Sequence, residues 1–95
     1  MIEEAHDDYS EHLKTLLADP DFRKEWEADE AEYRVRAAII AARLASGMTQ
    51  KQLAITSGID QRAISRIESG NSNPTVRTLG RIAHGLGRSL KVEFI

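Results

Sequence analysis

The sequence predicts a mainly α-helical domain in which four short helices follow one another, with an acidic helical arm before them and a short β-strand after them. Three observations lead to this prediction. Apolar residues recur at helical spacing between residues 33 and 86, Ser, Thr or Asp precedes most of these segments while Gly follows them, and the final residues alternate between apolar and polar. We therefore divide the chain into an arm (1–31), a helical domain (32–88) and a strand (89–95).

The arm is predicted to contain two short helices with an apolar stripe. Asp19 is a suitable N-cap, and Pro20 suits the first position of the helix that follows. The stripe consists of Leu13, Leu16, Leu17, Phe22 and Trp26. Two interpretations of the aromatic residues stay open: they anchor a partner protein, or they fold back and complete the core of the helical domain.

The first helix of the domain is expected to end near Ser46, with Gly47 supplying the left-handed residue after it. Four apolar residues share one of its faces: Tyr33, Ala37, Ile40 and Leu44. Arg43 lies on this helix and is assigned a structural role, because an arginine here can pair with Glu68 or cap a helix end.

The second helix is expected to begin after Thr49, whose hydroxyl can cap it, with Gln52 in the capping-box position. Leu53 and Ala54 face inward, and Gly58 permits the tight corner that ends the helix after about two turns.

The third helix is expected to begin after Asp60, another good N-cap, and to stop at Ser69-Gly70. Ile64 and Ile67 are its apolar residues, three positions apart. The remaining positions are mostly polar, so one face of this helix is free to meet a ligand.

A loop at 71–74 and a fourth helix beginning at Thr75 follow. The expected buried stripe of the fourth helix consists of Val76, Leu79, Ile82, Ala83 and Leu86. Residues 89–95 alternate with period two, which predicts a strand with Leu90, Val92 and Phe94 on one face. An unpaired strand edge invites a second strand, so this segment is a candidate dimer contact.

Composition and length fit one small domain with an appendage. The chain has 95 residues, of which 41% are hydrophobic and 29% are charged. Its longest uninterrupted apolar run, Ala37–Ala42, has six residues, whereas a membrane-spanning helix needs about 20. With no apolar signal segment after Met1, we expect a cytoplasmic protein with no membrane partner. The absence of cysteine excludes disulfides and thiolate zinc sites.

The charge is strongly polarised along the chain. Residues 1–32 contain twelve acidic and three basic residues, a net charge of −9. Residues 33–95 contain ten basic and three acidic residues, a net charge of +7. This asymmetry is typical of a basic binding module joined to an acidic tail, although an acidic arm that only keeps the chain soluble is an equal alternative.

The order of the second and third helices is the outline of a helix-turn-helix. The stretches Gly47–Ala54, Gly58-Ile59, Ile64-Ser65, Glu68–Gly70 and Pro74-Thr75, with Leu79 and Ile82-Ala83, closely resemble the Xre or lambda-repressor-like helix-turn-helix family over residues 36–86. This resemblance implies a four- to five-helix bundle whose third helix enters the major groove of DNA.

The whole chain also resembles antitoxins of the HigA kind, from type II toxin–antitoxin systems. The resemblance depends on Leu16–Trp26 before the helical module and on Leu86–Phe94 after it. It implies that the apolar stripe of the arm contacts a small basic toxin, a RelE/HigB-like ribonuclease, and that the protein represses its own operon.

The resemblance and the side-chain chemistry together indicate the DNA-contacting residues. Arginine can donate two hydrogen bonds to guanine, and glutamine can pair with adenine. Base contacts are expected from Gln61, Arg62, Ser65 and Arg66. Phosphate contacts are expected from Thr49, Gln50, Lys51, Asn71, Asn73 and Arg77. Arg62 departs from the family, where glutamine is common, and suggests a guanine preference at that position.

Nothing in the sequence assembles a catalytic, metal or cofactor site. The histidines, His6, His12 and His84, lack the i, i+4 spacing of a zinc helix. Gly85-Leu86-Gly87 follows a helix and lacks a third glycine, so it is a helix end and not a dinucleotide loop. We therefore predict no enzyme and no cofactor.

The sequence thus predicts a homodimeric repressor that binds double-stranded operator DNA and acts as an antitoxin. The leading alternative is a stand-alone Xre-family regulator without a toxin partner. A protein-interaction scaffold whose basic face never meets DNA is a further alternative.

Overall fold

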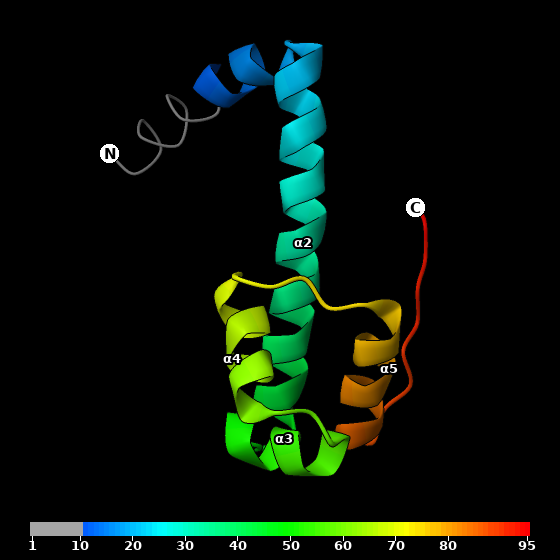
Figure 1. The fold of residues 1–95 in the computed structure, drawn as a ribbon. Helices are drawn as coiled ribbons and strands as arrows, with labels where there is room; N and C mark the ends of the chain where they lie inside the picture. Colours follow the sequence, from blue (N-terminus) through cyan, green and yellow to red (C-terminus); the bar gives the residue numbers. More distant parts are fainter. Residues whose placement is uncertain (1–10) are drawn as a thin grey trace, which may run out of the picture. The chain divides into compact units, whose positions relative to one another are not determined.

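The computed structural model describes residues 11–95 (Figure 1). Its regular elements are a helical segment over residues 11–17, α2 (Pro20–Ala45), α3 (Gln50–Ser57), α4 (Gln61–Ser69) and α5 (Val76–Gly85). The chain divides into two compact units between Ala31 and Glu32. The first ten residues of the predicted arm, His6 among them, lie outside the described residues.

α2 joins two helices that the sequence analysis placed separately. Its beginning is as predicted, because Pro20 takes the first position and the Asp21 N–H donates to Asp19 Oδ1 at 3.0 Å. The expected break between arm and domain does not occur. Residues 21–45 contain neither Gly nor Pro and are rich in Ala and Glu, which favour uninterrupted helix.

The core of the second unit is built from one or two side chains of each helix. Its buried members are Ile39, Leu53, Ile64, Ile67 and Ile82. α3 packs against both α4 and α5. The two helices of the predicted helix-turn-helix are therefore fixed to each other by a shared apolar core.

Three apolar residues that were expected to be buried are exposed. In α2, Tyr33 and Leu44 are 61% and 62% exposed, and Val35 and Ile39 face the core instead. In α5, Val76 is 73% exposed, whereas Ile82 is buried. Periodicity shows which residues share a face, but the neighbouring helices determine which face is covered.

The predicted caps of α3 and α4 are confirmed, whereas α5 begins at Val76, one residue later than expected, and Thr75 is its cap. Thr49 and Gln52 form a capping box: the Gln52 N–H donates to Thr49 Oγ1 at 3.1 Å, and the Thr49 N–H donates to Gln52 Oε1 at 2.8 Å. Asp60 Oδ1 accepts from the Arg62 N–H at 2.8 Å, and Thr75 Oγ1 accepts from the Thr78 N–H at 3.1 Å. These bonds fix where each short helix begins.

One close helix contact was not predicted. A Cβ atom added at Gly85 would lie 2.8 Å from Ser57 Cβ and 2.9 Å from the Ser57 backbone. Only glycine allows α5 to approach α3 this closely. The sequence analysis interpreted this glycine only as part of a helix end.

The strand predicted at residues 89–95 is wrong for the single chain. These residues follow α5 as an extended segment without helical turns (Figure 1), and no residue between 11 and 95 is in a strand. A strand needs a neighbour to complete its hydrogen bonds, and the described part of the chain offers none.

Among residues 11–95, no helix is both long enough and apolar enough to cross a membrane.

Candidate nucleic-acid interface

α4 has one buried face and one exposed polar face. Ile64 and Ile67 point into the core and are 0% and 3% exposed. The four residues expected to contact bases are all exposed: Gln61, Arg62, Ser65 and Arg66. The structure therefore brings all four together on one short, capped helix.

These side chains are largely free of other partners. Within residues 11–95, the side chains of Gln61, Ser65 and Arg66 form no hydrogen bond or ion pair. Arg62 Nε lies 3.8 Å from Asp60 Oδ1, and this exposed pair contributes little energy. Asp60, Arg62, Ser65 and Arg66 line an open hollow of about 460 Å³. The polar face of α4 thus keeps its donors available for a ligand.

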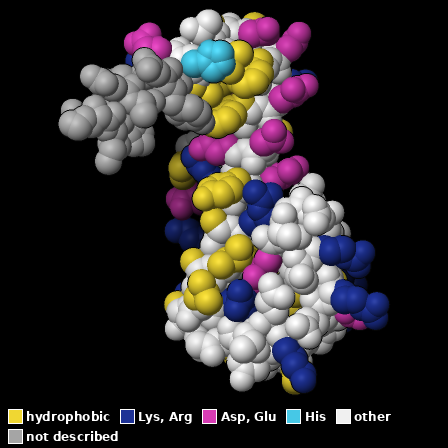
Figure 2. Space-filling model, turned by 90° about the vertical axis from the view of Figure 1, so that its left-hand side faces the viewer, with side chains coloured by type: hydrophobic (Ala, Val, Ile, Leu, Met, Phe, Trp, Pro, Cys, Tyr) yellow, Lys and Arg dark blue, Asp and Glu magenta, His cyan; other side chains and the backbone are white. Residues whose placement is uncertain are grey.

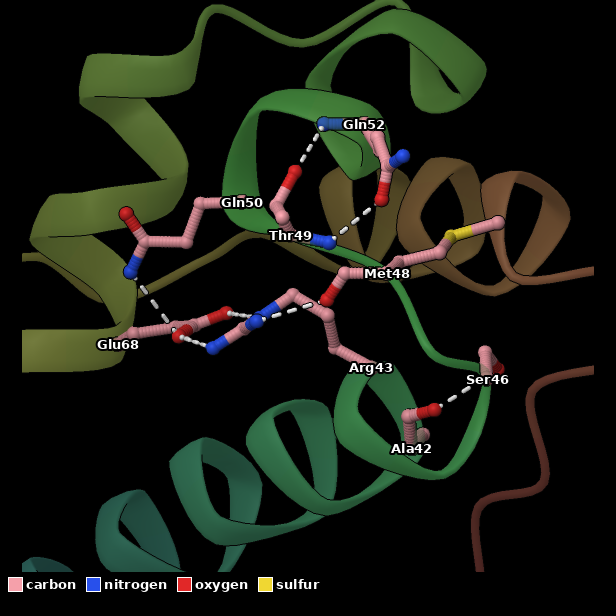
Figure 3. Close-up of polar contacts among 8 residues, drawn as sticks. All are labelled: Ala42, Arg43, Ser46, Met48, Thr49, Gln50, Gln52 and Glu68. Carbon is pink, nitrogen blue, oxygen red and sulfur yellow. Dashed lines mark hydrogen bonds and ion pairs between the residues drawn. The ribbon is translucent and has the colours of Figure 1, made fainter.

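The position of α4 is held by a buried ion pair between Arg43 of α2 and Glu68 of α4 (Figure 3). Arg43 Nε donates to Glu68 Oε2 at 2.8 Å and Nη2 donates to Oε1 at 2.9 Å, while Nη1 donates to the Met48 carbonyl at 2.9 Å. The two side chains are only 13% and 6% exposed. The predicted Arg43–Glu68 pair is confirmed.

The pair also shifts the ionisation of the arginine. Its hydrogen bonds with Glu68 raise the pKa of Arg43, against the opposing effect of burial, and the nearby carboxylate charge raises it further. Arg43 is therefore cationic across the neutral pH range and serves structure, because its donors point away from solvent.

Gln50 extends this network from α3 to α4. Its Nε2 donates to Glu68 Oε1 at 3.1 Å (Figure 3), and the residue is half-buried. The phosphate contact predicted at Gln50 can come from its backbone N–H at the start of α3. A contact from its side-chain amide would require the hydrogen bond to Glu68 to break first.

The other residues expected at phosphates lie in two environments. Lys51 and Arg77 are exposed, and neither side chain has a partner within residues 11–95. Thr49 is exposed, but its hydroxyl is occupied by the capping box. Asn71 Nδ2 donates to Ser69 Oγ at 3.2 Å, and Asn73 Nδ2 donates to Glu32 Oε1 at 3.1 Å. A phosphate contact at Asn73 would replace that bond.

Arg36 is a basic residue beside the end of α4 that the sequence analysis did not assign. Its Cζ lies 5.6 Å from the centroid of the Tyr33 ring, a cation–π arrangement. A Cβ atom added at Gly70 would lie 2.6 Å from Arg36 Nη1, so the guanidinium lies against the end of α4, where the helix dipole favours a cation. The i, i+3 spacing of Tyr33 and Arg36 on one helix was the sequence signal that could have predicted this contact.

The first unit has a hollow of its own. It has a volume of about 450 Å³ and is lined by Lys14, Leu17, Ala18, Arg23, Trp26, Glu27 and Glu30. Leu17 and Trp26 of the predicted toxin-contacting stripe meet here, whereas Leu13, Leu16 and Phe22 are half-buried outside the lining. On the face drawn in Figure 2, apolar side chains lie among Asp and Glu side chains in this unit.

Comparison with known families and curated proteins gives a consistent match. The model of the helix-turn-helix family matches residues 39–92. An uncharacterized HTH-type transcriptional regulator of Haemophilus influenzae is 41% identical over 54 residues, covering 57% of this chain and 55% of that protein. Another, of Sinorhizobium fredii, is 44% identical over 43 residues, covering 45% and 56%. The chain spans about half the length of these curated relatives.

Two kinds of solved structure are similar. The restriction-modification controller protein C.Esp1396I has 42% identity and a TM-score of 0.57 over 58% of this chain and 70% of its own. A toxin–antitoxin module from Streptococcus pneumoniae has 29% identity and a TM-score of 0.59 over 76% of this chain and 79% of its own. The second match covers more of this chain than the first.

Proposed function

This chain belongs to the Xre-type helix-turn-helix family, and from that premise we propose that two copies of it repress transcription by placing α4 in successive major grooves of an operator. The observation that carries the proposal is the division of α4 into a buried Ile64–Ile67 face and an exposed face with Arg62 and Arg66. In a pseudo-palindromic operator the two copies of α4 lie roughly 34 Å apart.

The roles of the basic residues differ in this proposal. Arg66, together with Gln61, Arg62 and Ser65, contacts base edges, which carry the sequence information. Lys51 and Arg77 contact phosphates, which position the domain and give affinity that falls with salt. The Arg43–Glu68 pair holds α4 at the angle that presents its exposed face.

The test compares two substitutions by gel shift across a salt series. Arg66→Ala should weaken binding to the cognate operator by about 1–3 kcal/mol and relax the sequence preference, because a base contact is lost. Lys51→Ala should weaken binding to all sequences alike and reduce the salt slope by about 1. Arg81→Ala is the matched control, since it removes an exposed arginine outside the proposed interface. If both variants and the control match the wild type at every salt concentration, α4 does not read DNA.

We also propose that the protein is the antitoxin of a type II toxin–antitoxin pair, whose arm binds a small basic RelE/HigB-like toxin. Two observations favour this role. Trp26 and Leu17 line one hollow of the arm, in a region (residues 1–32) that carries a net charge of −9, and an aromatic anchor in an acidic region suits a basic partner. In addition, the similar toxin–antitoxin module covers 76% of this chain. A stand-alone regulator is the alternative.

The antitoxin role is tested by co-purifying the full chain with the product of the adjacent gene. We expect a stable complex with a small basic protein, and Trp26→Ala should weaken it about thirtyfold, as loss of an aromatic hot spot does. Arg66→Ala should leave it unchanged. Absence of a complex favours the stand-alone regulator, whereas a complex that tolerates Trp26→Ala would mean that the partner does not bind through Trp26.

A further inference from the structure

The segment after α5 leaves all of its large apolar side chains uncovered. Leu90, Val92 and Phe94 are 42%, 67% and 97% exposed, and Ile95 is fully exposed. Alternating apolar residues of this kind are typical of a strand with one face against another surface, and no element within residues 11–95 covers them. Within the described residues, the segment therefore presents an apolar face without a partner.

Two copies of the segment are complementary when they run antiparallel with Val92 of one copy opposite Val92 of the other. On one face, Leu90 then lies opposite Phe94 of the second copy, twice by symmetry, and the two copies of Val92 lie opposite each other. On the other face, Lys91 lies opposite Glu93 of the second copy, also twice. Apolar residues meet apolar residues, and each charge meets its opposite.

The two alternative registers in which Lys91 or Glu93, instead of Val92, lies opposite its own copy lack this complementarity. Centring the pair on Lys91 places two lysines opposite each other, and centring it on Glu93 places two glutamates opposite each other. Like charges directly opposite are destabilising in a β-ladder. The charges thus select the register centred on Val92.

The single chain already holds the two charges on one side of the segment. Lys91 Nζ lies 3.3 Å from Glu93 Oε2, and both side chains are well exposed. On pairing, this local ion pair is exchanged for two cross-strand pairs, in which directly opposite Cβ atoms are about 4.5–5.5 Å apart. Both charges can make this exchange without any change in the helical domain.

We propose that a second copy of this chain docks on residues 89–95 to form a two-stranded antiparallel ribbon centred on Val92. The proposal rests on the two-copy arrangement proposed above and supplies its contact surface. An isolated ribbon of two strands is only marginally stable, so the paired helical domains have to contribute to the association as well.

A disulfide trap tests the register directly, because the chain has no cysteine of its own. In the proposed ribbon the two Cα atoms of residue 92 lie about 4.5–5.5 Å apart, within disulfide range. The two copies of residue 89 are offset by six positions, or about 20 Å, and are out of range. Mild oxidation without DNA should cross-link Val92→Cys rapidly and leave Ser89→Cys monomeric on non-reducing gels. Equal cross-linking of both variants, or none of Val92→Cys, overturns the register.

Charge exchange gives a second, independent readout by light scattering. Lys91→Glu or Glu93→Lys alone should weaken dimerisation about tenfold or more, because each creates two like-charge pairs. The double exchange should restore it. Arg88→Glu is the matched control, since it makes the same charge change outside the paired residues. If the double exchange fails to restore the dimer, or if Arg88→Glu weakens it equally, the proposal is wrong.

These measurements detect association of two chains in the absence of DNA, so a negative result for the ribbon can be distinguished from a negative result for operator binding. A cross-linked Val92→Cys dimer that binds no operator supports the ribbon and overturns operator binding. Operator binding by a protein whose segment does not pair in this register supports the function and overturns the ribbon.

Discussion

At the scale of single residues, the most consequential feature is the buried Glu68 carboxylate. It accepts from Arg43 Nε and Nη2 and from Gln50 Nε2, so three donors from two helices converge on one side chain of α4. The Glu68 side chain is only 6% exposed, so water cannot replace these donors without a large cost in free energy. Glu68 therefore ties the α4 end to both α2 and α3.

Glu68→Gln should lower the free energy of unfolding by about 3 kcal/mol. The substitution keeps the shape but leaves the Arg43 cation buried without its counter-ion and places an amide N–H₂ near other donors. Urea denaturation with circular dichroism measures the change. Glu27→Gln is the control, because the Arg23–Glu27 pair is exposed and should contribute less than about 1 kcal/mol. A change at Glu68 no larger than at Glu27 would show that the network is not structural.

At the scale of helices, the sequence correctly predicted the features that depend only on neighbouring residues. Thr49 and Asp60 cap the helices expected of them, because a cap depends on a few adjacent residues. The grouping of Arg62 and Arg66 on one exposed face likewise follows from helical spacing and the burial of Ile64.

What depends on distant neighbours was not predictable from one sequence. The exposure of Tyr33 and Val76 depends on which faces the other helices cover, and the stacked Arg36 depends on where α4 ends. Gly85 is explained only by the Ser57 backbone that it touches. The failure at 89–95 has a different cause, since a strand requires a partner segment.

At the scale of the whole molecule, the opposing charges of the two parts bear on DNA affinity. The net charge of −2 is the sum of −9 over residues 1–32, which include the arm, and +7 over residues 33–95. A phosphate backbone attracts the domain and repels the arm, and the repulsion acts over about 30 Å at 0.01 M salt but only about 10 Å at 0.1 M. The arm should therefore suppress non-specific binding mainly at low salt.

Neutralising two exposed acidic residues of the arm, Glu25→Gln with Asp29→Asn, should raise affinity for a random duplex about two- to fivefold at 0.01 M salt. The gain should shrink toward zero by 0.2 M, as the charges are screened. Fluorescence anisotropy with a labelled duplex measures both. Glu25→Asp with Asp29→Glu keeps the charge and is the control. Affinity that stays constant at low salt would mean that the charge of the arm does not reach bound DNA, and would leave partner binding or solubility as its role.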